Sequence, residues 1–230
     1  MNAVLYFSCS GQSKCVADDL AKRLDWELFE TKDAHGCYES VAVVFPVHCQ
    51  SYPAPLKNFF KNLCADNVAL IATYGRAHHG NAIYEATKLL KCPVTAAAYL
   101  PAKHAYSDSG DTAFVPEQLV KILRESKKGD ACANIPKLRK TPFAAIFPAT
   151  RSRAIIKIKM NGNCTKCNTC GNVCPVNAIA FGKPSSKCLR CLKCVYECPQ
   201  NALYTKKSTA LRIYLKKPRF DKILIYTSKG

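Results

Sequence analysis

The chain has 230 residues, a net charge of +18 and 15 cysteines. This length is enough for one large domain or two modest ones, each with its own core, and no apolar run is long enough to span a bilayer. The first residues are apolar without a basic region before them, so we expect no signal peptide and, with this many cysteines, a reducing compartment such as the cytoplasm.

The first predicted element is a buried parallel strand at residues 2–7, where an apolar run is rich in β-forming residues. A helix is predicted from residue 13 or 14 to residue 24, because apolar residues recur there at helical spacing. The loop between them, residues 8–13, offers hydroxyls and exposed amides at a helix N-terminus, where a phosphate is attracted. The loop has neither a Walker A nor a G-x-G-x-x-G pattern, and an ordinary capped turn has a similar composition.

Strands and helices continue to alternate as far as about residue 130. Strands are predicted at 41–45, 68–73 and 94–100, and helices at 55–63, 83–90 and 117–127. This alternation predicts an α/β domain with a parallel sheet and helices on both faces.

The loop at residues 8–13 resembles the flavodoxin phosphate loop, [ST]-x-[ST]-G-x-[ST], except that Gln12 stands where many relatives have Asn. The resemblance implies a flavodoxin-like domain over residues 1–130, with strand order 2-1-3-4-5 and an FMN cofactor bound at the carboxyl edge of the sheet. The first loop would hold the phosphate, and the loops that begin at Pro46 and Tyr74 would flank the isoalloxazine. The candidate flavin-binding residues are Ser8, Cys9, Ser10, Gly11, Gln12, Ser13, Pro46, Val47, His48, Tyr74, Gly75 and Gly80.

Two questions about these loops stay open. His48, Tyr52 or Tyr74 would stack on the flavin ring, and the sequence does not choose among them. We interpret His78 and His79 as exposed loop residues rather than catalytic ones.

Residues 131–158 are punctuated by prolines and are predicted to connect two domains. The charge distribution changes at the same point. Residues 1–130 contain 14 Lys and Arg residues and 14 Asp and Glu residues, so their charges balance. Residues 131–230 contain 20 Lys and Arg residues, whereas their acidic residues are Glu197 and Asp221. The basic part is either a solvated surface or a docking surface for an acidic redox partner. We do not expect nucleic acid, because no nucleic-acid-binding motif accompanies the charge.

The pattern C-x2-C-x2-C-x3-C-P occurs twice between Cys164 and Pro199. Three thiolates at this spacing can hold three irons of a cubane, and the fourth, just before proline, ligates the other cluster. The first [4Fe–4S] cluster would therefore take Cys164, Cys167, Cys170 and Cys198, and the second would take Cys188, Cys191, Cys194 and Cys174. Zinc is the main alternative. Two C-x2-C pairs supply the four sulfur ligands that a zinc ion needs, so the third cysteine of each run would have no ligand role. Disulfides are a third interpretation.

Residues 159–207 resemble bacterial dicluster ferredoxins, including the runs after Pro175 and Pro199 that fit C-P-x-x-A-[IL]. The whole chain is similar to fused flavodoxin–ferredoxin proteins of anaerobes, although ferredoxins are commonly acidic. The resemblance implies an α/β flavodoxin-like domain followed by an α+β dicluster module, acting in electron transfer with FMN. Alternatives are an FMN-dependent reductase of an organic substrate, a ferredoxin whose flavodoxin-like part binds no flavin, and a nucleic-acid-associated cluster protein.

The remaining sequence gives weaker signals. Seven cysteines outside the motif show no ligand spacing and are interpreted as small side chains; they are Cys9, Cys15, Cys37, Cys49, Cys64, Cys92 and Cys132. For Cys9 and Cys49, which lie on the proposed flavin loops, a redox role is the alternative. Residues 208–230 are predicted to form a C-terminal extension, with strands or a hairpin at 211–215 and 222–226.

Overall fold

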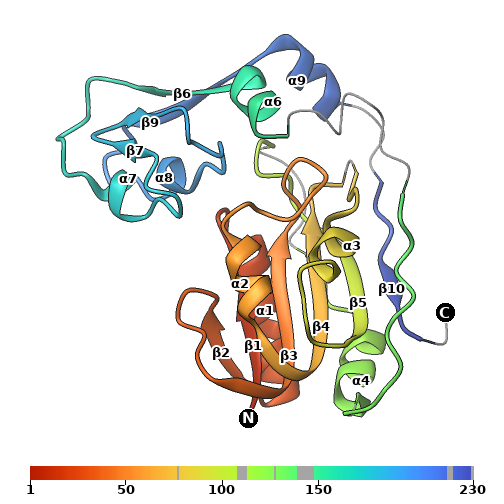
Figure 1. The fold of residues 1–230 in the computed structure, drawn as a ribbon. Coiled ribbons are helices and arrows are strands. Elements are labelled where there is room, and N and C mark those ends of the chain that lie inside the picture. The colour runs from red at the N-terminus through yellow and green to blue at the C-terminus, as the bar shows by residue number, and fades with distance from the viewer. Residues whose placement is uncertain (77, 108–112, 127, 139–147, 217–219, 229–230) are drawn as a thin grey trace. The chain divides into compact units, whose positions relative to one another are not determined.

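The computed structural model describes residues 1–76, 78–107, 113–126, 128–138, 148–216 and 220–228 (Figure 1). The chain divides into two compact units. Unit 1 comprises Met1–Lys140 with Arg219–Gly230, and unit 2 comprises Thr141–Pro218. Among the described residues, no helix has the length and apolar character needed to cross a membrane.

Unit 1 is built on a six-stranded sheet of order β10-β5-β4-β3-β1-β2. Five strands run parallel: β1 (Asn2–Tyr6), β2 (Glu27–Glu30), β3 (Cys37–Pro46), β4 (Cys64–Tyr74) and β5 (Val94–Pro101). Their order, 2-1-3-4-5, confirms the predicted doubly wound α/β fold. The sixth strand, β10 (Leu224–Tyr226), pairs antiparallel with β5.

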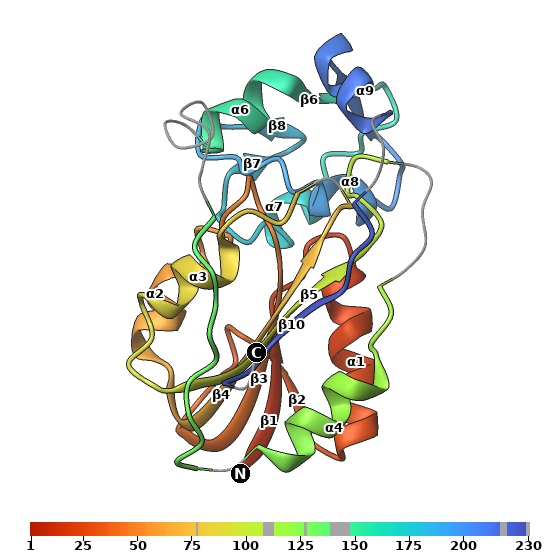
Figure 2. The ribbon, with the colours of Figure 1, turned by 90° about the vertical axis from the view of Figure 1, so that its right-hand side faces the viewer.

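Helices cover both faces of this sheet, as Figure 2 shows. On one face lie α1 (Gln12–Leu24) and α4 (Glu117–Glu125), and on the other lie α2 (Leu56–Asn62) and α3 (Ala82–Thr87). Successive strand residues point to opposite faces, so the same apolar strands supply two separate cores. Leu70 belongs to the core under α2 and α3, and Ile71 to the core under α1 and α4.

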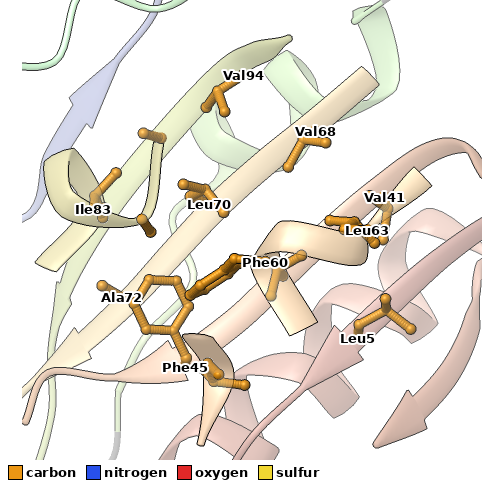
Figure 3. Close-up of a cluster of buried hydrophobic side chains, with 14 of the residues drawn as sticks. Leu5, Val41, Phe45, Phe60, Leu63, Val68, Leu70, Ala72, Ile83 and Val94 are labelled. Carbon is orange, nitrogen blue, oxygen red and sulfur yellow. The ribbon is translucent and has the colours of Figure 1, made fainter. Parts of the chain in front are cut away.

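The core under α2 and α3 contains the larger side chains of the sheet (Figure 3). Phe45 of β3 and Phe60 of α2 are fully buried, with ring centroids 5.5 Å apart in an edge-to-face arrangement. Burying one such side chain stabilises the fold by about 1.5–3 kcal/mol. The apolar runs that predicted the strands therefore also form the sheet side of this core.

Unit 2 consists of short elements. They are α6 (Pro148–Ile155), β6 (Ile156–Met160), α7 (Thr169–Asn172), β7 (Ile179–Ala180), β8 (Lys183–Pro184), α8 (Lys193–Tyr196), β9 (Leu203–Lys207) and α9 (Thr209–Leu215). β6 pairs antiparallel with β9, and β7 with β8. Of the connection predicted at 131–158, residues 139–147 lie outside the described residues.

The strand predicted at residues 211–215 is wrong, because these residues lie in α9. The hydroxyl of Ser208 caps this helix by accepting a hydrogen bond from the Leu211 amide at 3.2 Å. A serine cap satisfies a backbone donor that the helix itself leaves unpaired, so the capped helix is preferred over an isolated strand.

The end of the chain returns to unit 1. The amide of Phe220 donates to the Arg76 carbonyl at 2.8 Å, and the Tyr74 hydroxyl donates to the Lys222 carbonyl at 2.6 Å. The strand expected near residues 222–226 is therefore β10, an additional edge strand of the main sheet rather than part of a separate hairpin. In sequence, unit 2 is inserted into unit 1.

The interpretation of the seven additional cysteines as free small side chains is wrong for two of them. Cys37 and Cys64 form a disulfide, and they are direct register partners at the first positions of β3 and β4. Their Cα atoms lie 4.7 Å apart, within the range that a disulfide requires. The other thirteen cysteines are free.

Candidate functional site

The loop between β1 and α1 has the features of an anion-binding turn. Gly11 precedes α1 with φ 86°, a left-handed conformation that glycine adopts readily, and no side chain caps the helix. The first turn of α1 contains no acidic residue that would compete for its amides. Helix α1 has 13 residues, so its N-terminal amides and dipole favour a negatively charged group.

The side chains of this loop fall into two classes. The hydroxyl of Ser13 is buried and lies 2.8 Å from the Thr73 hydroxyl, which joins α1 to β4. In contrast, Ser8 Oγ and Gln12 Oε1 are buried with no hydrogen-bond partner among the described residues. An unpaired buried polar atom costs about 1–3 kcal/mol, so these two atoms are suited to a bound polar ligand.

The second candidate loop follows β3. The Val47 amide donates to the Thr73 carbonyl at 2.7 Å, and His48 and Ser51 exchange backbone hydrogen bonds of 2.8 and 3.1 Å. The two residues inside this tight turn, Cys49 and Gln50, have φ values of 52° and 68°. A turn with two left-handed residues normally contains glycine or asparagine, so this loop holds backbone strain of the kind found at binding sites.

The third candidate loop, after β4, is locked to the second. Gly80 has φ 63°, and a Cβ there would collide with the backbone of Gln50. The Asn81 amide donates to the Gln50 carbonyl at 3.0 Å, and the Ser51 hydroxyl donates to the Glu85 carboxylate. The second and third loops are therefore joined through Gln50 and Ser51.

Tyr74, one of the three residues predicted to stack on a flavin, lies in the core. Its side chain is 1% exposed, and its ring packs near Phe220 at 6.0 Å between centroids. Burial raises the pKa of the Tyr74 phenol to about 12. His48 and Tyr52 are only partly buried in the second loop, so they are better placed than Tyr74 to meet a ligand.

His79 contradicts the interpretation of both loop histidines as exposed, although His78 agrees with it. The His79 side chain is 7% exposed, its ring lies 4.1 Å from that of Tyr99, and its Nδ1 lies 3.0 Å from the Gly80 carbonyl oxygen. Burial lowers the pKa of His79 because the imidazolium loses hydration.

A fourth loop at the same edge was missed by the sequence analysis. His104 and Tyr106 follow β5, with ring centroids 5.2 Å apart, and the His104 ring fills the space where a Cβ on Gly75 would lie. The Tyr106 amide donates to His104 Nδ1 at 3.0 Å. The signal that could have found them is positional: they follow the fifth strand of a doubly wound sheet, at its ligand-binding edge.

The two cysteine loops of unit 2 repeat in backbone conformation as well as in sequence. Left-handed residues occur between the cysteines at Lys166 and Asn168, and recur 24 residues later at Arg190 and Leu192. Asn177 and Asn201 form a third pair, and α7 and α8 occupy equivalent positions. Loops that mix right- and left-handed residues turn successive amides inward, as in many iron–sulfur sites.

Backbone amides also donate hydrogen bonds to the cysteine sulfurs, and one of these bonds recurs in both loops. The Ala178 amide donates to Cys174 Sγ at 3.2 Å, and the Ala202 amide donates to Cys198 Sγ at 3.3 Å. The Gly182 amide donates to Cys170 Sγ at 3.3 Å. Amide hydrogen bonds to sulfur stabilise the negative charge of thiolates and tune the potential of a cluster.

The eight motif cysteines are all free thiols. Burial raises the pKa of Cys194 to about 12, and the negative charges of Cys191, Cys188, Cys174 and Cys170 raise it further. Within the described part of the chain, no group of three or more His, Cys, Asp or Glu residues is arranged around a single metal ion.

No family model matches the chain, and no curated protein matches its sequence. Solved structures similar to part of it include a putative flavoprotein from Bacteroides uniformis, with 18% identity, 44% of this chain and 90% of that chain covered, and a TM-score of 0.36. A flavodoxin from the domain Archaea has 18% identity, 45% and 85% coverage, and a TM-score of 0.35. The Trp repressor binding protein from Bacillus subtilis has 15% identity and a TM-score of 0.34, and the match covers 55% of this chain and 99% of that chain. These values are low, so the fold assignment rests on the strand order itself.

Proposed function

We propose that the chain is an electron-transfer flavo-iron–sulfur protein that passes electrons between two [4Fe–4S] clusters and FMN. The observation that carries this proposal is the duplicated eight-cysteine loop of unit 2, whose left-handed positions and amide-to-sulfur hydrogen bonds repeat in register. A flavin joins one-electron and two-electron chemistry, which single-electron clusters alone do not provide.

The cluster ligands follow from the repeat. Cys164, Cys167 and Cys170 would hold one cluster together with Cys198, and Cys188, Cys191 and Cys194 would hold the other together with Cys174. Cys174 and Cys198 accept equivalent hydrogen bonds from the amides of Ala178 and Ala202, so the fourth ligand has the same local setting in both repeats. A zinc site would use four of these eight thiols and leave the duplicated turns unexplained.

The FMN phosphate would bind at the start of α1. Ser8 Oγ can donate a hydrogen bond to it, as can the amides of the first turn, whereas Gln12 Oε1 can accept one from a ribityl hydroxyl. Ser13 supports the loop through Thr73 rather than through the ligand. The second and third loops, joined at Gln50 and Gly80, would flank the ring.

The partner would be an acidic redox protein in the cytoplasm of an anaerobe. Residues 148–216 contain thirteen Lys and Arg against Glu197 alone, and two oxidised clusters with their thiolates would remove only about four charges. The first loop contains an exposed cysteine, Cys167, whereas Cys188, Cys191 and Cys194 of the second loop are buried or partly buried. The first cluster would therefore exchange electrons with the partner, and opposite charges would speed the encounter.

The deciding experiment measures iron, acid-labile sulfide and flavin per chain after anaerobic purification. About eight iron, eight sulfide and one FMN support the proposal. Eight iron without flavin, even after incubation with FMN, would reduce unit 1 to a scaffold beside a ferredoxin. Zinc in place of iron would reject the proposal.

A second candidate is an FMN-dependent reductase of an organic substrate, fed by the clusters. His104 and Tyr106 favour it, because they bring potential proton donors to the edge where the flavin would bind. Reduced protein that is reoxidised only by a protein acceptor supports the carrier. Multiple turnover with a small organic acceptor, lost in His104→Gln, supports the reductase.

A further inference from the structure

The disulfide between Cys37 and Cys64 differs from every other cysteine site in the chain. Both cysteines are exposed, and each is the first residue of its strand. They lie at the amino-terminal edge of the sheet, whereas the candidate flavin loops follow the carboxyl ends of the strands. β3 has 10 residues and β4 has 11, so the two edges are roughly 30 Å apart. The disulfide is therefore at the opposite end of the sheet from the loops proposed to bind FMN.

The strands around this disulfide are held in register without it. Tyr38 and Ala65, the next register partners, face the core, where Tyr38 is buried. Farther along, the Asn67 side chain donates to Ser40 Oγ at 3.5 Å and accepts from the Thr95 hydroxyl. Because these contacts fix β3 and β4 next to the cysteines, opening the bond leaves the two thiols facing each other.

Cys92 provides a contrast within the same region. Its thiol donates to the Leu63 carbonyl at 3.1 Å and accepts from the Ala65 amide at 3.3 Å, on either side of Cys64. Its hydrogen-bonding capacity is thus used by the backbone on both sides of Cys64, and its side chain packs against the core. Cys92 serves a structural role, whereas the exposed pair beside it is accessible to an external thiol.

We propose that Cys37 and Cys64 form a reversible thiol–disulfide exchange site whose reductant is a dithiol. A thiolate of the dithiol attacks one sulfur of the pair, forming a mixed disulfide and releasing the other cysteine as a thiolate that takes up a proton. The second thiol of the reductant, as its thiolate, then attacks the mixed disulfide and releases the second cysteine, which is protonated in turn. The site gains two electrons and two protons, and the dithiol leaves as a disulfide.

The geometry supports both directions of this exchange. Exposed disulfides are the ones that external thiols reach, whereas buried ones resist reduction. Reoxidation is favoured because the strand register holds the reduced cysteines with their Cα atoms 4.7 Å apart, a separation already suited to the bond. The exchange site requires neither the clusters nor FMN, so its test is independent of the test of the proposed function.

The experiment uses the full-length protein, purified anaerobically and equilibrated with mixtures of reduced and oxidised dithiothreitol. Acid quenching, alkylation and peptide mass spectrometry then give the state of each cysteine. Trypsin places Cys37 in a peptide of residues 33–57, together with Cys49, and Cys64 in a peptide of residues 62–76. Cys49 is thus an internal reference, because it should be alkylated whatever the mixture.

We expect the two peptides to be cross-linked in the oxidised mixtures and both cysteines to be alkylated in the reduced ones, with the same curve from either starting state. The conservative variant Cys92→Ser should leave this curve unchanged. Cys37→Ser should convert Cys64 into a single thiol that forms a mixed disulfide with glutathione when oxidised glutathione is added.

Three results would overturn the proposal. The bond could remain closed in the folded protein and open only in denaturant, which would make it a permanent structural link. The two cysteines could stay reduced in every mixture, which would mean that the disulfide does not form. A change of the curve in Cys92→Ser would show that the pair is not sufficient by itself. The first two results are measured on the unaltered protein, so they do not depend on whether a variant folds correctly.

Discussion

The two units of this chain are built from different side chains and from elements of different lengths. Unit 1 contains both large buried clusters, drawn from five parallel strands and four helices, and its residues 1–130 carry no net charge. In unit 2, three of the buried side chains are cysteines of the proposed clusters, Cys170, Cys188 and Cys194. Unit 1 is therefore an α/β domain with two apolar cores, whereas unit 2 buries cysteine thiols among its aliphatic side chains.

The lengths of the elements lead to the same conclusion. α7 and α8 have four residues each, and β7 and β8 have two each, whereas β3 and β4 have ten and eleven. Helices this short do not form alone, because the free-energy cost of nucleation exceeds the stabilisation from the hydrogen bonds of a single turn. Bound metal commonly supplies the missing free energy in such modules. The comparison therefore predicts that the stability of unit 2 depends on bound metal, whereas the stability of unit 1 depends on apolar packing.

The largest expected effect is the loss of structure in unit 2 when iron is removed. After anaerobic purification, treatment with an oxidant and a chelator should abolish protection of the amides in residues 160–205, while β1, β3 and β4 stay protected. Hydrogen exchange with peptide mass spectrometry measures both regions in one sample. If both units lost protection together, or neither did, the comparison would be wrong.

A smaller effect is expected from removing one ligand. Cys198→Ala should remove the cluster bound by Cys164, Cys167 and Cys170, about half of the iron, because the fourth ligand of each cluster comes from the other loop. The matched variant Cys174→Ala should remove the other cluster. Iron analysis and electron paramagnetic resonance of the two variants distinguish the clusters. Loss of the cluster next to Cys198 in sequence would contradict the exchange of ligands.

In unit 1, the corresponding test is a cavity in the core. Leu70 is fully buried between β3 and β5, so Leu70→Ala should lower the free energy of unfolding of unit 1 by about 2–5 kcal/mol. Trp26, the single tryptophan, packs against the other core of unit 1 and reports its unfolding by fluorescence. Phe114→Ala is the control, because that side chain is 67% exposed and should change stability by less than about 0.5 kcal/mol. Iron content should stay unchanged in both variants.

Removing the disulfide should also affect unit 1 alone. Cys37→Ser opens a loop whose ends are 27 residues apart, and the change should destabilise the oxidised protein by about 3.5 kcal/mol. The difference between the variant and the unaltered protein should disappear when both are unfolded in a reducing dithiol. A difference that persists in the reduced proteins would trace the effect to packing instead of the covalent link.

Local patterns were enough to predict much of this fold. The apolar runs at residues 41–45 and 68–73 predicted strands because side chains buried on both faces of a parallel sheet leave no polar alternation. The hydroxyl-rich turn after the first strand predicted where α1 would begin, since Gly11 and the serines are typical of a helix start. The cysteine spacing likewise predicted two equivalent turns, and the repeated φ values at Lys166 and Arg190 agree with it.

Long-range contacts could not be predicted in the same way. Nothing near Cys37 indicates that Cys64, 27 residues away, would be its register partner. Tyr74 is covered by Phe220 and bonded to Lys222, residues that follow the whole of unit 2 in sequence. A segment of three residues such as β10 has too little pattern of its own, so its place beside β5 depends on the sheet that it joins.

The smallest expected effect is a pH dependence of unit 1 that arises at His79. The pKa of this imidazole in the folded protein is lowered, chiefly by burial among Tyr74, Tyr99 and Phe220 and also by His78, although the Gly80 carbonyl opposes the shift. The unfolded chain therefore takes up a proton as the pH falls below about 6.5, while the folded chain does not. This contribution to stability is complete above that pH and decreases below it, until the folded pKa is reached.

His79→Asn should flatten this part of the stability profile, measured by Trp26 fluorescence in denaturant between about pH 5.5 and 7.5. His35→Asn is the matched control, because His35 is exposed and should leave the slope as it is in the unaltered protein. A slope that survives in His79→Asn would assign the pH dependence to another group. If the iron content changed with pH while the unfolding free energy of unit 1 did not, the pH sensitivity would lie in the thiols of unit 2. That result would weaken the contrast between the two units.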